Sequence, residues 1–395
     1  MKTSSQFDIV VYGATGFTGQ LVAEYLAAHY VGAGKPTWAM AGRSLEKLAN
    51  VRAAIGAPAD IPLIVADAGD PASLKAMVDQ ANMVLTTVGP YQYYGTELVA
   101  ACAATGTDYL DLCGEPLWMR QMIDAHEASA KTTGARILFS CGYDSIPFEL
   151  GVFFCQQTAI KQLGAPVNRI KGRVRAMKGT LSGGTAASMK AMFSAAANDL
   201  SLVALMRNPF VLTPGFDGPR QPPGNKPLYD EDLASWTTPF VMANINTRNV
   251  HRSNMLLGFP YGRDFVYDEM MLTGPGEQGE QRARRILAAN TSEKMGSGGP
   301  KPGEGPSKEE RESGLYDLLF VGLAPDGRQV RVAVRGDRDP GYGSTSKMIA
   351  ECAILLRQSP EVKGGIWTPG AALGHGLIKR LVDHAGLTFE VETSS

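Results

Sequence analysis

The sequence is short of cysteine and of long hydrophobic runs, and neither sign of charge is in excess. Its 395 residues include five cysteines without a C-x-x-C pair, which favours free thiols in a reducing compartment. The 38 Lys and Arg residues balance 39 Asp and Glu residues, so no overall field attracts nucleic acid. Every apolar stretch is interrupted before the roughly 18 residues that a membrane helix needs. Because the first residues also lack the apolar core of a secretory signal, we expect a cytoplasmic protein that binds no nucleic acid.

Histidine is scarce as well, and its spacing excludes several kinds of site. The five histidines show no H-x-x-x-H or H-E-x-x-H pattern, and no grouping of Cys with His indicates zinc. The G-x-S-x-G elbow of one class of hydrolases is also absent from the sequence, which argues against that chemistry. We therefore expect no metal site and no hydrolase of that type.

What the sequence does contain, from Phe7 to about Ser140, is an alternation of short apolar runs and amphipathic segments. Apolar runs of this length, separated by helices, are typical of parallel strands that are covered on both faces. The expected strands are 9–12, 37–41, 63–66, 83–88, 109–112 and 136–139. This part of the chain predicts an α/β fold with a Rossmann-type, doubly wound parallel sheet.

The first expected strand leads directly into a glycine-rich turn and an amphipathic helix. The turn has the sequence Gly13-Ala14-Thr15-Gly16-Phe17-Thr18-Gly19. Gly13 permits a tight turn, Gly16 removes a side chain where a pyrophosphate must approach, and Gly19 lets the helix lie close to the sheet. Because the amides that start such a helix attract phosphate, the turn predicts dinucleotide binding. A purely structural turn is the alternative.

The end of the second expected strand indicates which dinucleotide binds. An NAD enzyme places a carboxylate there for the adenosine ribose, but this sequence has Arg43 and Ser44. A guanidinium and a hydroxyl suit a 2′-phosphate, so we expect NADP(H). An ordinary surface cation at a helix start is the alternative for Arg43. Asp67, after the third strand, either contacts the adenine edge or caps the next turn.

Further polar clusters follow the fourth, fifth and sixth expected strands. Because ligands bind beyond the carboxyl ends of the strands in open α/β sheets, these clusters can hold the nicotinamide and the substrate. The expected neighbours of the nicotinamide ribose are Val88, Gly89, Pro90 and Tyr91. The candidates for substrate contact or proton transfer are Tyr91, Tyr94, Glu115, Tyr143 and Asp144. From these we predict Tyr91, Tyr143 and Asp144 as catalytic residues.

The pattern changes beyond Pro147. A helix is expected from about Phe148. Segment 169–177 follows it and alternates apolar with polar residues, which predicts an antiparallel strand with one face exposed to water. Two further strands are expected at 315–321 and 329–334, and helices at 345–357 and 377–384. We expect a Rossmann domain at 1–150, an inserted α+β substrate or dimerisation domain at 151–340, and a C-terminal segment at 341–395. Segments 208–239 and 292–313, rich in Pro, Gly or charge, are expected to be mobile loops.

Several of these motifs occur in one order and together resemble the saccharopine-dehydrogenase-like oxidoreductases, and within them the bacterial trans-acting enoyl reductase group. The segments that carry the resemblance are 10–20, 39–44, 88–95, 111–116 and 142–147, with weaker similarity at 183–185, 341–343 and 364–370. The resemblance implies that the inserted domain covers the nicotinamide and that segment 341–395 packs back on the Rossmann domain. It also implies reduction of a carbon–carbon double bond in a lipid or polyketide chain, which a partner protein sometimes carries.

The implied mechanism needs a hydride from NADPH, a donor to the developing enolate oxygen and an acid for the α-carbon. We expect Tyr91 or Tyr143 in the donor's role, with support from Asp144 and the turn 183–185; Lys190 is a lesser candidate. One alternative is an imine or carbonyl reductase of a small polar substrate, which arginines in the cleft, such as Arg173, Arg175 or Arg248, would favour. Another is an NADP(H)-binding protein without turnover. We expect a hydrophobic small-molecule substrate, while association with a membrane surface or carrier protein and a homodimer stay open.

Overall fold

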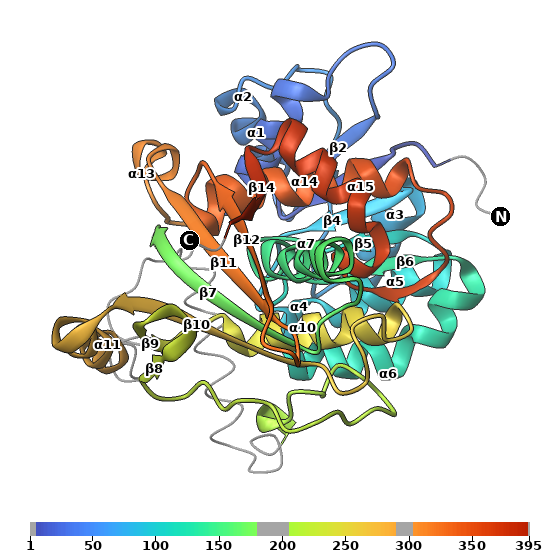
Figure 1. Cartoon of the computed structure of the whole chain (residues 1–395). Helices are drawn as coiled ribbons and strands as arrows, with labels where there is room; N and C mark the ends of the chain where they lie inside the picture. Colours follow the sequence, from blue (N-terminus) through green and yellow to red (C-terminus); the bar gives the residue numbers. More distant parts are fainter. Residues whose placement is uncertain (1–4, 180–204, 290–302, 394–395) are drawn as a thin grey trace.

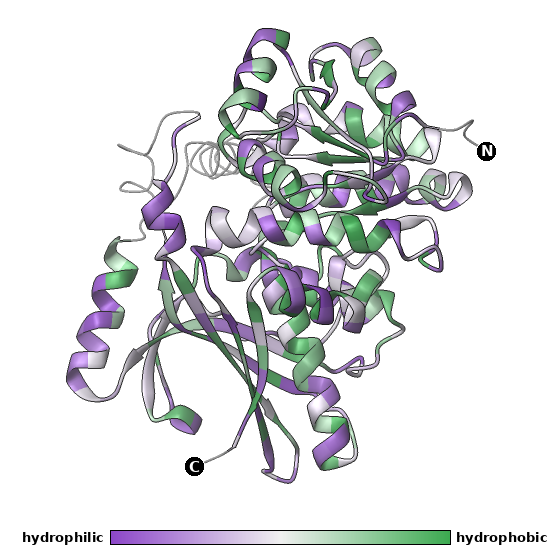
Figure 2. Cartoon of the chain, turned by 90° about the horizontal axis from the view of Figure 1, so that it is seen from above, coloured by the Kyte–Doolittle hydropathy of each residue, from purple (hydrophilic) through white to green (hydrophobic). Residues whose placement is uncertain are grey.

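The chain folds around two seven-stranded sheets with helices packed on and between them (Figures 1 and 2). The computed structural model describes residues 5–179, 205–289 and 303–393. Within these ranges, no helix has the combined length and apolar content that crossing a bilayer needs.

The first sheet has the strand order β13-β6-β5-β4-β1-β2-β3, and all its neighbouring strands are parallel. Its strands are β1 (Ile9–Tyr12), β2 (Trp38–Gly42), β3 (Leu63–Val65), β4 (Met83–Thr86), β5 (Asp108–Leu110), β6 (Arg136–Leu138) and β13 (Gly365–Trp367). Every residue of β1, β2 and β4 is buried, which is why these strands are apolar without alternation. The Rossmann-type sheet is confirmed, and β13 adds a strand that the sequence pattern did not predict.

Helices cover both faces of this sheet, and local signals set where they begin. They are α1 (Phe17–His29), α2 (Leu45–Ala54), α3 (Pro71–Gln80), α4 (Tyr91–Tyr94), α5 (Thr96–Thr105) and α6 (Pro116–Thr133). The Asp70 carboxylate accepts the Ala72 amide at the start of α3, and Pro71 occupies its first turn. Such caps satisfy amides that have no partner inside the helix.

The second sheet is mixed and has the order β14-β12-β11-β7-β10-β9-β8. Its strands are β7 (Arg169–Lys178), β8 (Leu228–Asp230), β9 (Ser235–Pro239), β10 (Val266–Gly274), β11 (Leu315–Leu323), β12 (Gln329–Gly336) and β14 (Leu387–Glu392). The predicted strand at 169–177 is present, but it is antiparallel only to β11 and pairs in parallel with β10. In Figure 2 hydrophilic and hydrophobic residues alternate along this sheet, whereas the central strands of the first sheet are hydrophobic throughout.

Regular structure also forms where the sequence predicted mobile loops. Strands β8 and β9 lie inside segment 208–239, with the short helix η1 (Glu231–Leu233) between them. Tyr229 of β8 and the Trp and Thr residues of β9 favour strands, but the Pro and Gly residues around them led to the prediction of a loop. In segment 292–313, residues 292–302 lie outside the described ranges, and α13 (Lys308–Glu312) begins with a capping box formed by Ser307 and Glu310.

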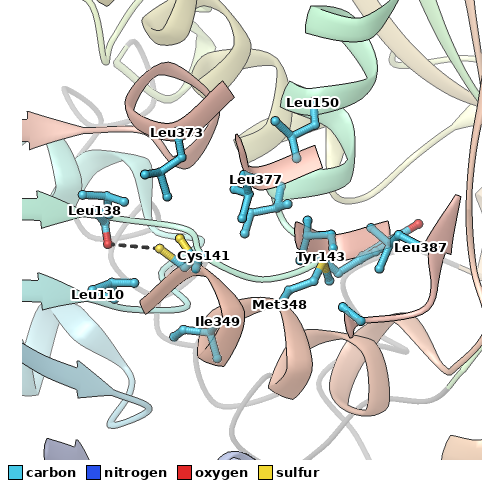
Figure 3. Close-up of a cluster of buried hydrophobic side chains, with 14 of the residues drawn as sticks. Leu110, Leu138, Cys141, Tyr143, Leu150, Met348, Ile349, Leu373, Leu377 and Leu387 are labelled. Atoms are coloured by element: carbon cyan, nitrogen blue, oxygen red, sulfur yellow. Dashed lines mark hydrogen bonds between the residues drawn. The ribbon is translucent and has the colours of Figure 1, made fainter. Parts of the chain in front are cut away.

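The remaining long helices are α11 (Gly276–Ala289), which packs on β9 and β10 of the second sheet, and four helices that pack together between the two sheets. These four are α7 (Ile146–Leu163), α10 (Ala243–Leu256), α14 (Thr345–Arg357) and α15 (Pro369–His384), with the short η2 (Pro340–Ser344) before α14. Figure 3 shows the core that they share, where Leu138 of β6, Leu150 of α7, Ile349 of α14 and Leu377 of α15 lie in one buried cluster. The C-terminal segment therefore packs on the first sheet, to which it adds β13, and also on the second, to which it adds β14.

Candidate active site

Two glycines of the turn after β1 are required by the packing around them. Gly13 has a φ of +89°, and a Cβ atom there would lie 2.7 Å from Cγ2 of Val88. A Cβ on Gly19 would overlap the carbonyl oxygen of Gly13. The first turn of α1 thus packs against the glycine loop, and also against Thr87, the residue that follows β4. Both positions exclude a side chain for reasons internal to the protein.

Gly16 differs, because the space around it is open. It is exposed, and a Cβ there would meet only the Gly13 carbonyl oxygen, at 3.3 Å. Gly16 caps α1, and the helix begins with no side-chain cap and no acidic residue in its first turn. The partial positive charge of this helix end therefore faces outward without a counter-charge from its own turn.

Hydrogen bonds inside the loop identify the amides that are left for a ligand. Gly13 and Ala14 both donate to the carbonyl oxygen of Ala41, and Gly16 donates to that of Gly13. The amides of Phe17, Thr18 and Gly19 have no partner within the helix, because they belong to its first turn and the first bond inside α1 is that of the Gln20 amide to Gly16. These first-turn amides, unlike those of Gly13, Ala14 and Gly16, are left to meet an anion.

The residues predicted to recognise the adenosine end divide into one open side chain and two with structural partners. Arg43 is exposed and forms no ion pair in the part of the chain that the structure describes. The Ser44 hydroxyl accepts the Lys47 amide at 3.2 Å and so caps α2. Asp67 accepts the Gly69 amide at 2.9 Å. Arg43 therefore remains the group best placed to bind a 2′-phosphate.

The loop after β4 is fixed by a carboxylate from the loop after β5. Glu115 accepts the amides of Tyr91 and Gln92, at 2.9 and 2.8 Å, and the buried Tyr91 hydroxyl accepts the Leu112 amide at 3.1 Å. These contacts fix the two loops against each other, while the expected roles of Glu115 and Tyr91 in substrate contact or proton transfer stay predictions. Gly89, just before this pair of contacts, is exposed.

Tyr143 links the end of β6 to the second sheet. Its amide donates to Oγ1 of Thr345 at 3.0 Å, its ring lies 5.0 Å from that of Tyr316, and its hydroxyl donates to Sδ of Met177 at 3.6 Å. A thioether is a weak acceptor. Burial raises the pKa of Tyr143 well above its usual value, so this phenol gives up its proton reluctantly.

Asp144, the next residue, is only partly buried and lies against the loop after β5. Its Oδ2 atom is 3.2 Å from the place where Gly114 would carry a Cβ, so Gly114 makes room for the carboxyl. Burial raises the pKa of Asp144 to about 7, opposed only by a hydrogen bond from its own backbone. Near neutral pH this carboxyl is therefore partly protonated, at the edge of the sheet where ligands bind.

A second carboxyl with a raised pKa lies on the inner face of the second sheet. Glu269 of β10 accepts hydrogen bonds from Nδ2 of Asn246 and from the Tyr267 hydroxyl, both at 2.9 Å. Burial raises its pKa to about 8, and it acts electrostatically on Tyr143. Nothing in the sequence pattern distinguished Glu269 from a surface residue.

The three arginines that would favour a small polar substrate all have hydrogen-bond or ion-pair partners. Two form ion pairs within the second sheet, and the third binds oxygen atoms close to its own helix. These contacts are Arg173 with Asp230 and Asp268, Arg175 with Asp317 and Glu392, and Arg248 with the Asn244 side chain and the Met206 carbonyl. None of them is free to bind a substrate carboxylate without first breaking such a contact.

The remaining candidates are Tyr94, the turn 183–185 and Lys190. Tyr94 is exposed at the end of α4, where its ring meets that of Tyr93. The turn 183–185 and Lys190 lie outside the described residues. Neither set is placed by the structure beside Asp144.

Sequence reasoning missed a group of residues that surrounds Phe17, the first residue of α1. Arg311 of α13, Gly305 before that helix and Tyr342 of η2 all contact the Phe17 ring. The capping-box pattern from Ser307 to Glu310 was the one local signal that a helix forms there.

Comparison with known proteins identifies the kind of enzyme. Residues 9–138 match the family described as the saccharopine dehydrogenase NADP binding domain. The chain is 40% identical over 408 residues to a Mycobacterium tuberculosis protein named as a trans-acting enoyl reductase, with 96% of each chain covered. It is 38% identical over 409 residues to the trans-acting enoyl reductase of Mycobacterium leprae, covering 95% of this chain and 96% of the relative.

Two solved structures share the fold at low sequence identity. Apo saccharopine dehydrogenase (L-Glu forming) from Saccharomyces cerevisiae has a TM-score of 0.55 and 12% identity, covering 98% of this chain and all of the other. The homospermidine synthase of Legionella pneumophila in complex with NAD has a TM-score of 0.56 and 10% identity, covering 99% and 93%. The chain is therefore an NADP-dependent oxidoreductase, and it belongs to the trans-acting enoyl reductase family of saccharopine-dehydrogenase-like proteins.

Proposed function

We propose that this enzyme reduces the carbon–carbon double bond of an unsaturated carbonyl compound with a lipid-like or polyketide-like chain. The names of its relatives support this reaction. The single observation that carries the proposal within the molecule is Asp144, a carboxyl with a pKa of about 7 at the carboxyl edge of the first sheet. An enoyl reduction needs such a proton source, because the carbon next to the carbonyl must be protonated.

The residues of the first domain fit the NADP cofactor. The uncapped first turn of α1 and the open space at Gly16 suit its diphosphate, and the exposed Arg43 suits its 2′-phosphate. Gly89 and Pro90 are proposed neighbours of the nicotinamide ribose. When bound, NADPH supplies the hydride for the reaction.

The loop after β6 then provides the proton. We assign Asp144 as the acid, because its partial burial keeps the proton bound until about pH 7. Tyr143 holds this loop against the second sheet through Met177 and against the start of α14 through Thr345, so its role is to position Asp144. Tyr91 positions the loop after β4 in the same way, through Leu112.

The character of the second sheet favours an apolar substrate over a small polar one. Arg173 and Arg175 are paired with carboxylates, while Met177, next to the Tyr143 hydroxyl, is 40% exposed. Methionine adapts its shape to irregular apolar ligands. A long acyl chain would therefore meet thioether and aromatic groups on leaving Asp144.

The test is oxidation of NADPH by the purified enzyme with enoyl thioesters of increasing chain length, beside an imine and a ketone. We expect turnover with the enoyl thioesters and preference for the longer chains. Preference for the imine or the ketone would contradict the proposal.

Asp144→Asn tests the proton donor. We expect kcat to fall roughly 100-fold, with the Kd for NADPH unchanged. An acid must be protonated to act, so the wild-type kcat should decline as pH rises through about 7, and this decline should be absent in Asp144→Asn. Glu97→Gln, an exposed carboxyl on α5, is the control. Retention of the wild-type pH profile in Asp144→Asn would assign the proton to another group.

A further inference from the structure

A segment of the second domain reaches the first turn of α1. Residues 303–312, which we call the α13 segment, pass over the side chain of Phe17. A Cβ on Gly305 would lie 2.5 Å from the Phe17 ring, so only glycine allows this approach. The guanidinium carbon of Arg311 lies 5.6 Å from the centroid of the same ring. The α13 segment therefore places a cation beside the helix end at which we locate the diphosphate.

The α13 segment is held in this place by several hydrogen bonds. The Ser307 side chain and the Glu310 carboxylate close a capping box at the start of α13. Nη1 of Arg311 donates to the Pro306 carbonyl at 2.7 Å, and the carbonyl of Arg311 accepts the Asp339 amide at 3.0 Å. Both the backbone and the side chain of Arg311 are thus fixed, which lowers the entropy cost of binding a ligand there.

Within the described ranges Arg311 forms no ion pair, because no carboxylate there lies within ion-pair distance of its guanidinium. Asp339 acts on it electrostatically, but that carboxylate accepts the amides of Tyr342 and Gly343 at 3.0 and 2.7 Å. The first turn of α1 also lacks an acidic residue. An anion at this helix end would meet the helix amides and a permanent cation together.

We propose that Arg311 is a further cofactor-binding residue, which contacts the diphosphate of the dinucleotide from the second domain. The inference rests on the proposed placement of the diphosphate at the start of α1. Arg311 and Arg43 then divide the anionic groups of NADPH between them. Arg43 follows β2 and binds the 2′-phosphate, whereas Arg311 stands beside Phe17 and binds the diphosphate. A guanidinium forms paired hydrogen bonds with phosphate oxygens, so each contact is strong.

The two assignments predict different ligand dependence. NADPH and NADH both contain the diphosphate, but only NADPH contains the 2′-phosphate. Loss of Arg311 should therefore weaken both dinucleotides by the same factor, roughly tenfold or more for a charge-assisted contact. Loss of Arg43 should weaken NADPH alone. Adenosine 2′-monophosphate, which has no diphosphate, should be sensitive to Arg43 and insensitive to Arg311.

The experiment measures Kd for these three ligands by titration of the full-length protein. Arg311→Gln removes the charge and keeps a donor for the Pro306 carbonyl, while Arg311→Lys keeps the charge and should recover part of the affinity. Arg338→Ala is the matched control, because Arg338 also binds a carbonyl of the α13 segment, that of Glu312, but lies near Asp337. Thermal unfolding of each variant reports whether the fold is kept.

The outcomes separate the inference from the proposed function. If the wild-type protein binds neither dinucleotide, the proposed cofactor site fails. If the wild type binds both and Arg311→Gln binds them equally well, only the role of Arg311 fails. A loss of affinity for adenosine 2′-monophosphate in Arg311→Gln would also overturn it, because that loss would indicate a general disturbance of the first domain.

Discussion

The two seven-stranded sheets are stabilised in different ways. In the first sheet, the central strands β1, β2 and β4 are buried along their whole length, between helices on both faces. In the second sheet, β7 alternates Ile170 and Val174 with Lys171, Arg173 and Arg175. Those cations form ion pairs with carboxylates of β8, β10 and β11.

The difference indicates which residues of each sheet cannot be exchanged without loss of stability or function. Apolar strands of the first sheet can exchange one branched side chain for another at modest cost, so its function depends on the loops at its carboxyl edge. A buried ion pair does not tolerate the exchange of one side chain, because removal of one partner leaves the buried charge of the other uncompensated. In the second sheet the residues that cannot be exchanged therefore lie within the strands, whereas in the first sheet they lie in the loops at the ends of the strands.

The strongest test of this contrast is Gly19→Ala. The added Cβ would overlap the Gly13 carbonyl oxygen, so α1 must move away from the loop. We expect the free energy of unfolding to fall by about 3 kcal/mol and NADPH binding to be lost. Gly16→Ala is the control, since its Cβ meets the same oxygen only at 3.3 Å. It should weaken NADPH binding while leaving stability within about 1 kcal/mol of wild type. Equal losses of stability in Gly19→Ala and Gly16→Ala would contradict the different packing roles assigned to these two glycines.

Asp230→Ala examines the second sheet in the same manner. Removing this carboxylate deprives the buried Arg173 and the nearby Lys171 of a partner. We expect a loss of about 2–3 kcal/mol in chemical denaturation, with the Kd for NADPH unchanged. Asp326→Ala breaks a pair with Arg328 in which both side chains are more than half exposed, and should cost less than about 1 kcal/mol. A small effect of Asp230→Ala would mean that Asp268 alone suffices for Arg173.

The smallest expected effect concerns pH. Burial raises the pKa of Glu269 to about 8, so the folded protein keeps a proton that the unfolded chain releases above about pH 4.5. Stability should therefore fall as pH rises from about 4.5 to 8.

Glu269→Gln keeps an acceptor for Asn246 and removes the charge. It should be more stable than wild type at pH 8 by about 1–2 kcal/mol. Burial also raises the pKa values of four other carboxyls, and these keep part of the slope in the variant: Asp111, Asp144, Glu149 and Asp339. If the stability of Glu269→Gln fell with rising pH as steeply as that of the wild type, the pKa of Glu269 would not be raised in the folded protein.

Much of the first sheet could be predicted because its signals are local. Six of its strands lie within a few residues of the expected ranges, since each is an apolar run bounded by Gly, Pro or polar residues. The glycine turn after β1 was recognisable for the same reason. β13 was not, because three residues carry no periodicity and their partner, β6, lies more than 200 residues earlier in the chain.

The second half of the chain shows why local patterns were insufficient there. Helix α10 buries polar side chains, among them Asn246, Asn249 and His251, so its sequence lacks the apolar face that predicts a buried helix. The contact of Arg311 with Phe17 joins residues at opposite ends of the chain. Because only the folded chain brings such residues together, this part of the candidate site could not be predicted from the sequence.

The position of β13 has a consequence for how this protein is made. Its partner β6 ends at Leu138, but β13 itself begins at Gly365 of a 395-residue chain. During synthesis the sheet therefore has an open edge at β6 until more than 200 further residues have been made. An open strand edge can pair with another nascent chain. The pairing of β13 with β6 removes this edge, so residues far along the chain protect the sheet that binds the coenzyme.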